Sequence, residues 1–155
     1  MKIFLMITIC CLFLSCNKDE SEIRITNGIS FNTNVYLFAK DINGRDLLNP
    51  SNPHAFMQND LKYFQILDGK KVEILDVSQY QIMKFVNKQD TIFCLKLGCN
   101  YINYIEWSKG DMDTLECTMN TSHGLRIETA SYNGKPLEFT NPYNLWHGFT
   151  IVKNH

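Results

Sequence analysis

The sequence predicts an all-β protein: a single antiparallel β-sandwich, Ig-like or similar, of about eight strands that follows a signal peptide. Three observations indicate this class. Short stretches rich in β-branched and aromatic residues recur along the chain, turn signals separate them about every ten residues, and no stretch keeps a helical period. A small β-barrel would show the same pattern and is the alternative.

The N-terminal residues 1–15 have the features of a signal peptide. The run from Ile3 to Leu14 follows Lys2 and carries no charge. Twelve residues rise about 18 Å as a helix, which is too short to cross a hydrocarbon core of roughly 30 Å. The length matches the apolar region of a signal peptide instead.

The segment LFLSC, which ends at Cys16, resembles a bacterial lipobox, in which the cysteine is acylated and becomes the new N-terminus. The SCNKDE segment resembles lipoproteins of Bacteroidota, where charged residues after the cysteine are associated with export to the cell surface. We therefore expect lipidation at Cys16, a lipidated tether over 16–28 and a β-sandwich domain over 29–155. The acyl chains would anchor the protein in the bacterial outer membrane. An ordinary cleaved secretory signal is the alternative.

The first half of the domain contains one predicted strand, a loop and two hairpins. The strand lies in FNTNVYLFAKD, before the turn residues Asn43 and Gly44. A loop is predicted in LLNPSNPHAFMQND, which contains two prolines. One hairpin joins DLKYFQIL to KVEIL through Asp68 and Gly69, and the next joins YQIMKFV to DTIFCLKL.

The second half continues the same pattern. A further hairpin is predicted from NYINYIEW and DTLECTM, which flank the turn SKGDMD. A long strand and the turn residues Asn133 and Gly134 lie in GLRIETASYNGKPLEF, and a closing strand lies in NLWHGFTIVK.

The order of these segments is similar to that of small lipoproteins of gut Bacteroidota. The residues that carry the resemblance are DLLNPSNP, YFQILDGK, YINYIEWSKGDMDTLECTM and SYNGKPL, within about residues 30 to 138. The shared motifs are a Trp-turn-D-x-D-T hairpin and a late Asn-Gly, which are turn signals. The resemblance implies an exported β domain and carries over no catalytic residue.

Charge and cysteine content exclude some partners and leave others open. Without the signal segment, 14 basic residues face 16 acidic ones, and no basic patch supplies the attraction that nucleic acid needs. The mature domain would keep Cys94, Cys99 and Cys117, an odd number that allows one disulfide at most. Cys94 and Cys117 are predicted on neighbouring strands and are candidate partners. Three buried thiols are the alternative.

Two acidic turns offer the oxygen ligands that Ca²⁺ prefers, but neither has the EF-hand order. We expect both to be ordinary solvated turns, and no metal or other cofactor. Their residues are Asp41, Asn43 and Asp46, and Asp111, Asp113 and Glu116.

No local motif of a nucleophile, base or zinc site is present in the sequence, so we expect a protein that is not an enzyme. A pair formed by one of the three domain cysteines with His123 is conceivable, because folding brings distant residues together. A small hydrolase whose residues converge only in the fold is therefore an alternative.

Aromatic residues are the main indication of ligand binding. Trp107, Tyr143 and Trp146 are candidate ligand-facing residues, because flat aromatic faces stack on sugars or on a partner protein. Core packing is the alternative for aromatic residues on strands.

Two short segments resemble the D-[ST]-apolar acceptor of O-glycosylation in exported Bacteroidota proteins. They make Thr91 and Thr114 candidate glycosylation sites. A threonine that caps a turn through its hydroxyl is the alternative.

Together these features predict a lipid-anchored, non-catalytic cell-envelope protein that binds a glycan, a peptide or an envelope partner. A structural or assembly subunit of an envelope complex is a second expectation, in which a partner strand pairs with an exposed sheet edge.

Overall fold

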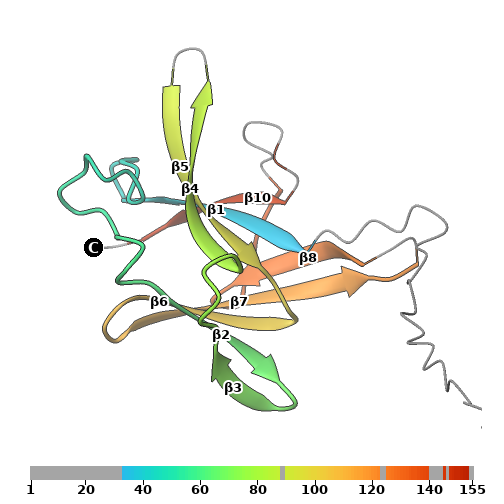
Figure 1. Ribbon diagram of the computed structural model, residues 1–155. Coiled ribbons are helices and arrows are strands. Elements are labelled where there is room, and N and C mark those ends of the chain that lie inside the picture. The colour runs from blue at the N-terminus through green and yellow to red at the C-terminus, as the bar shows by residue number, and fades with distance from the viewer. Residues whose placement is uncertain (1–32, 88–89, 123–124, 140–144, 146, 154–155) are drawn as a thin grey trace, which may run out of the picture.

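The computed structural model describes residues 33–87, 90–122, 125–139, 145 and 147–153. Within these ranges the chain forms strands and no helix, which confirms the predicted all-β class (Figure 1). Ten strands are formed, of which β3 and β9 have only four and two residues. The described ranges also contain no apolar helix of the length that crosses a membrane.

Four strands form the smaller sheet, in the order β10-β1-β5-β4. They are β1 (Asn34–Lys40), β4 (Tyr80–Asn87), β5 (Asp90–Gly98) and β10 (Gly148–Val152). The pairs β1–β5 and β4–β5 are antiparallel, as predicted, but β10 lies parallel to β1 with Tyr36 opposite Gly148. The prediction of a purely antiparallel fold is wrong at this pair. A parallel neighbour needs a long crossover, and here the whole larger sheet lies between β1 and β10 in the chain.

Six strands form the larger sheet, in the order β3-β2-β6-β7-β8-β9, and every neighbouring pair is antiparallel. They are β2 (Lys62–Leu67), β3 (Lys70–Glu73), β6 (Ile102–Ser108), β7 (Asp111–Asn120), β8 (Arg126–Tyr132) and β9 (Lys135–Pro136). The register of β7 against β8 shifts between Thr118 and Met119, which marks a bulge in the middle of the sheet.

The turn signals form the hairpins that the sequence predicts. Asp68 and Gly69 join β2 to β3 with φ angles of 50° and 73°, and Asn133 and Gly134 join β8 to β9 with 49° and 73°. Positive φ at both central residues is the geometry of a type I′ turn, whose twist matches that of the strands.

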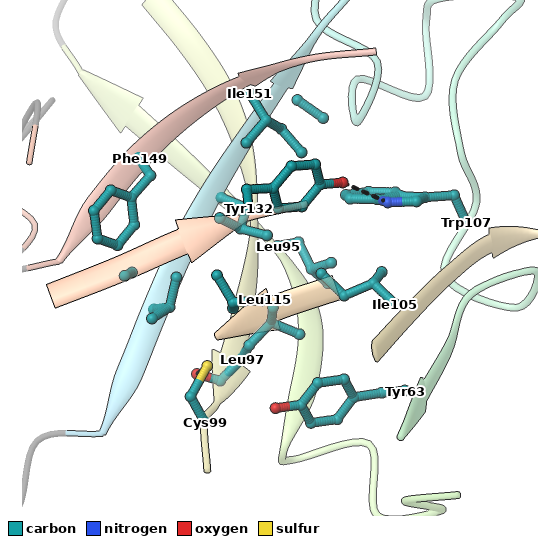
Figure 2. Packing of buried hydrophobic residues seen from close by; sticks show 14 of the residues in the cluster. Tyr63, Leu95, Leu97, Cys99, Ile105, Trp107, Leu115, Tyr132, Phe149 and Ile151 are labelled. Carbon is teal, nitrogen blue, oxygen red and sulfur yellow. Dashed lines mark hydrogen bonds between the residues drawn. The ribbon is translucent and has the colours of Figure 1, made fainter. Parts of the chain in front are cut away.

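The core lies between the two sheets and contains side chains from both (Figure 2). Leu37, Leu95 and Phe149 enter it from the smaller sheet, and Tyr63 and Trp107 from the larger one. The two sheets stay separate, so the fold is a sandwich and the barrel alternative is wrong.

The predicted loop between β1 and β2 also contributes to the core. Its Leu47, Leu48, Phe56 and Leu61 are buried, and backbone hydrogen bonds of 2.9 Å and 2.8 Å tie Leu47 to Ala39 and Phe56 to Leu47. The Phe56 ring lies 5.0 Å from the Trp107 ring, centroid to centroid. This segment therefore forms part of the core cluster.

Candidate functional site

Of the predicted ligand-facing aromatic residues, Trp107 is the one that the structure describes. Trp107 has no exposed surface: its ring packs on Phe56, and its indole N–H donates a 2.9 Å hydrogen bond to the Tyr132 hydroxyl oxygen. The prediction that Trp107 faces a ligand is wrong, because its strand position places it on the inner face with Ile105. Tyr143 and Trp146 lie outside the described residues.

An open groove of about 510 Å³ lies on the larger sheet, and we call it the β7 groove. Its lining residues come from the segment before β6 and from β6, β7, β8 and β9. They are Tyr101, Ile102, Glu116, Cys117, Thr118, Thr129, Ala130, Ser131 and Pro136. The volume is within the range of small-molecule sites.

Strand register builds the β7 groove in two rows. The first row runs across four strands, where Ile102 lies opposite Glu116, Glu116 opposite Ser131, and Ser131 opposite Pro136. The second row is formed by Thr118 opposite Thr129. Because side chains alternate between the faces of a strand, Glu116 and Thr118 point away from the core that holds Leu115.

Hydrogen bonds fix the polar groups of the second row and the position of Tyr101. The hydroxyl oxygens of Thr118 and Thr129 lie 2.7 Å apart, and the Thr129 N–H donates to Thr118 Oγ1 over 3.1 Å. The carbonyl oxygen of Tyr101 accepts a 2.8 Å hydrogen bond from the Cys117 N–H. The Tyr101 side chain itself is 58% exposed at the end of the groove.

The chemistry of the β7 groove combines an exposed aromatic ring, one carboxylate and three hydroxyl groups. The carboxylate of Glu116 accepts hydrogen bonds, while the hydroxyls of Thr118, Thr129 and Ser131 both donate and accept them. The aromatic ring and the Ile102 side chain supply apolar contact. Such a surface can hold a polar ring compound that carries several hydroxyl groups.

A second cluster of charged groups is buried between the sheets. The ammonium group of Lys153 donates to Asp111 Oδ1 over 2.9 Å and also to Asp113 Oδ2. The Tyr132 hydroxyl donates to Asp113 Oδ2, and the Asn133 side-chain N–H donates to Asp113 Oδ1 over 2.7 Å. Every oxygen of the Asp113 carboxylate therefore has a partner within the protein.

The pKa values of this cluster follow from its contacts. Burial opposes ionisation of Asp113, but the hydrogen bonds from Lys153, Tyr132 and Asn133 outweigh it and hold the pKa of Asp113 below its usual range. Burial and the neighbouring Asp113 carboxylate raise the pKa of Tyr132. The cluster thus consists of an ionised carboxylate, its cation and a neutral phenol, which is a structural ion pair.

The two acidic turns are organised by hydrogen bonds within the chain. Asp41 Oδ1 accepts from the N–H groups of Asn43 and Arg45 at 2.8 Å each, and Asp46 accepts from the N–H groups of Leu48 and Phe93. The bonds from Asn43 and Leu48 span two residues, as in Asx turns, while the bond from Phe93 ties Asp46 to β5. In the other turn, Asp113 points into the sandwich and Glu116 into the β7 groove, so the two do not face one site.

Of the four histidines, the structure describes His54 and His147. His147 is buried with φ of 61°, and its Nδ1 lies 3.3 Å from the Asn34 carbonyl oxygen. Burial holds the pKa of His147 below its ordinary value, despite hydrogen bonds to the carbonyls of Asn34 and Ile127. His123, the candidate partner of a cysteine, lies outside the described residues.

The three domain cysteines are free and buried. Cys94 lies in β5 of the smaller sheet and Cys117 in β7 of the larger one, so the prediction that they occupy neighbouring strands is wrong. The thiol of Cys99, just after β5, donates a 3.7 Å hydrogen bond to the Leu97 carbonyl oxygen, and burial and the neighbouring Cys117 thiol raise the pKa of Cys99.

The candidate glycosylation sites differ in exposure. Thr91 is exposed near the start of β5, where it pairs with Val86 of the β4–β5 hairpin. Thr114 is half-buried within β7, and its backbone N–H and carbonyl bond to Asn133 at 2.8 Å and 2.9 Å. Glycosylation stays a prediction at both residues, and Thr91 is the more accessible acceptor.

Sequence reasoning missed most of the β7 groove. Thr118, Thr129, Ser131 and Pro136 carry no motif, and they meet only through the register of β7 with β8 and β9. The available signal was the alternation of polar with apolar residues in DTLECTM, which places Glu116 and Thr118 on the same face.

Comparisons of the chain with protein-family models, with curated proteins and with solved structures found no match.

Proposed function

We propose that the protein is a lipid-anchored component of the bacterial outer membrane that binds a carbohydrate in the β7 groove and does not turn it over. The lipobox-like segment ending at Cys16 supports the anchor and the export. The observation that carries the carbohydrate is the open groove itself, whose lining residues include Tyr101, Glu116 and three residues with hydroxyl groups.

Each group of the β7 groove has a role in this proposal. The Tyr101 ring, more than half exposed, stacks on the apolar face of a sugar ring, and Ile102 extends that contact. The Glu116 carboxylate accepts hydrogen bonds from a pair of sugar hydroxyls. The hydroxyls of Thr118, Thr129 and Ser131 complete the polar side.

The groove suits binding because its floor is built on paired strands. Most of its residues lie on paired strands, and the Thr118–Thr129 contact holds the second row in place. A site on regular strands keeps its geometry better than one on loops. The ligand therefore meets a surface that needs little rearrangement, which limits the entropic cost of binding.

Binding of the full chain to an array of neutral and acidic oligosaccharides tests the proposal. We expect retention on hydroxyl-rich oligosaccharides, a loss of roughly tenfold or more in affinity for Tyr101→Ala, and a similar loss for Glu116→Gln, since a hydrogen bond to a charged group contributes about 1.5–3 kcal/mol.

Two variants of the same residue types serve as controls. Tyr104→Ala removes a tyrosine from the same sheet outside the groove, where the Lys71 ammonium lies 4.4 Å from the centre of the ring. Glu73→Gln neutralises an exposed carboxylate on β3. If Tyr104→Ala abolished binding and Tyr101→Ala did not, the site would lie on the face around Lys71, and the groove would not be the site.

A second candidate function is assembly through the edge of β4. The side chain of Gln58 blocks the first part of this edge: its oxygen accepts from the Ile82 N–H at 2.6 Å, and its amide donates to the Tyr80 carbonyl. Further along, the N–H groups of Lys84 and Val86 point the same way as that of Ile82, and no described residue bonds to them. Val86 is 74% exposed on the projecting β4–β5 hairpin (Figure 1).

An added strand from a partner would bond to these groups. The variant Val86→Pro removes one edge donor without touching a bond to β5. Under this candidate, the chain extracted from membranes sediments as a larger assembly and Val86→Pro sediments as the single chain. Equal sedimentation of both at the mass of one chain would exclude it.

A further inference from the structure

We propose that Cys99 and Cys117 form a disulfide that links the end of β5 in the smaller sheet to β7 in the larger sheet. The reaction takes place when the folding chain meets a disulfide-bonded oxidant, such as the dithiol oxidases of exported compartments. Cys94 stays a free thiol.

The backbone brings the two cysteines together. The Cys117 N–H donates a 2.8 Å hydrogen bond to the carbonyl oxygen of Tyr101, only two residues after Cys99. The Cys99 N–H donates to the Thr33 carbonyl over 2.8 Å, which ties Cys99 to the segment before β1. The two thiols are both in the buried core cluster, where burial and the neighbouring Cys117 thiol raise the pKa of Cys99.

The Asn103 side chain fixes this arrangement from the side. Its amide N–H groups donate to the carbonyls of Asn100 and Leu115 at 2.6 Å and 3.0 Å, and its oxygen accepts from the Asn100 N–H at 2.8 Å. Asn103 is fully buried, and the Tyr63 hydroxyl donates to the same oxygen. The segment after β5 is therefore held against β7.

Cys94 does not belong to this pair. It is fully buried in β5, where it lies opposite Met83 of β4, and its strand neighbours are all in the smaller sheet. Of the three pairings that the domain cysteines allow, the structure supports only Cys99 with Cys117.

The chemistry balances as a thiol–disulfide exchange. A thiolate of one cysteine attacks a sulfur of the oxidant, and the second cysteine then displaces the oxidant from the mixed disulfide. One sulfur–sulfur bond forms in the protein, one breaks in the oxidant, and the oxidant leaves as a dithiol that carries the two electrons and two protons.

The folded protein is expected to react slowly. Burial and the Cys117 thiol raise the pKa of Cys99, which leaves little thiolate, and both sulfurs are shielded from a bulky oxidant. The bond therefore forms mainly while β5, β6 and β7 close during folding, before the core excludes the oxidant.

Tryptic mapping of the full chain tests the proposal, because each domain cysteine lies in its own peptide. The segment 89–96 contains Cys94, the segment 97–109 contains Cys99, and the segment 110–126 contains Cys117. Protein refolded with oxidised glutathione and alkylated before digestion should give 97–109 joined to 110–126, with 89–96 alkylated. A folded, oxidised sample in which Cys99 and Cys117 are both alkylated, or one that joins Cys94 to either of them, would overturn the proposal.

Thermal unfolding gives a second measurement that does not depend on peptide recovery. A bond that closes a loop of this length should raise Tm by on the order of 10 °C, and dithiothreitol should remove the increase. Cys117→Ala should abolish both the joined peptides and the response to dithiothreitol, while Cys94→Ala should keep both. A response to dithiothreitol that persisted in Cys117→Ala would contradict the assignment. Refolding in vitro needs no export, so failure of this test leaves the proposed location untouched.

Discussion

The indole N–H of Trp107 donates a 2.9 Å hydrogen bond to the Tyr132 hydroxyl oxygen (Figure 2). That hydroxyl in turn donates to the Asp113 carboxylate. The carboxylate binds the ammonium group of Lys153, which follows β10 of the other sheet. One continuous chain of hydrogen bonds therefore crosses the sandwich. The two carboxylates explain how the buried Lys153 is tolerated. The buried Asp113 carboxylate compensates its charge, and the more exposed Asp111 carboxylate accepts a second hydrogen bond from it.

Breaking this ion pair should destabilise the fold. In Lys153→Met the buried Asp113 carboxylate keeps its bonds from Tyr132 and Asn133 but loses its cation, which costs roughly 3–5 kcal/mol for a buried pair. Urea unfolding measures the change. The control Lys62→Met removes an exposed lysine 3.9 Å from Glu106 and should cost less than about 1 kcal/mol. Equal costs for the two variants would show that the buried pair has no special role.

Asp113 should also make the free energy of unfolding depend on pH in the acidic range. Its pKa is lowered in the folded chain, so its contribution is complete above the ordinary value of 3.8 and is lost as pH falls through the folded pKa. We expect the free energy of unfolding to fall more steeply below about pH 4 in the wild type than in Asp113→Asn. Urea unfolding at several pH values measures both slopes, and parallel curves would contradict this account of the carboxylate.

His147 should make the stability of the fold depend on pH in a higher range than Asp113 does. Because burial lowers its pKa, the unfolded chain binds a proton more readily than the folded one, and stability falls as pH drops from the ordinary value of 6.5 through the folded pKa. Asparagine does not titrate and tolerates the positive φ of 61° at this position. His147→Asn should therefore unfold at more similar urea concentrations at pH 7.5 and pH 5 than the wild type does, and an unchanged difference would contradict the prediction.

The hairpins could be predicted from the sequence because their signals are local. The pairs Asp68-Gly69 and Asn133-Gly134 adopt the positive φ angles that short turns require, and each lies between two strands. The inward position of Trp107 could also be predicted from the sequence, because Trp107 and Ile105 are two residues apart in β6 and therefore point to the same face of the sheet.

Features that depend on contacts between distant segments could not be predicted. The parallel pairing of β10 with β1 leaves no mark in either strand, because a strand has the same alternation in both directions. The Cys99–Cys117 contact crosses between sheets, and the β7 groove depends on a register that shifts at Thr118. Sequence alternation gives the face of each residue but not its neighbour on the next strand.

Lipidation at Cys16 should decide where the chain is found. The wild type, expressed with its signal segment in a bacterial host, should fractionate with membranes and give a mature mass that includes the acyl chains on Cys16. Cys16→Ser should move the chain out of the membrane fraction, because the thiol that receives the first lipid is gone. Cys11→Ser, a change in the segment that is removed, is the matched control. Membrane association that survives Cys16→Ser would rule out the anchor.

The position of a bound oligosaccharide on the sheet shows whether the β7 groove is the binding site. The measurement is a titration of the isotope-labelled Cys16→Ser chain with the oligosaccharide best retained on the array, followed by amide chemical shifts. The account predicts shifts confined to the β7 groove, at Ile102, Glu116, Thr118 and Ser131, with none around Phe64 and Lys71 of the neighbouring strands. Shifts centred on Phe64 and Lys71, or none anywhere at saturating oligosaccharide, would contradict it.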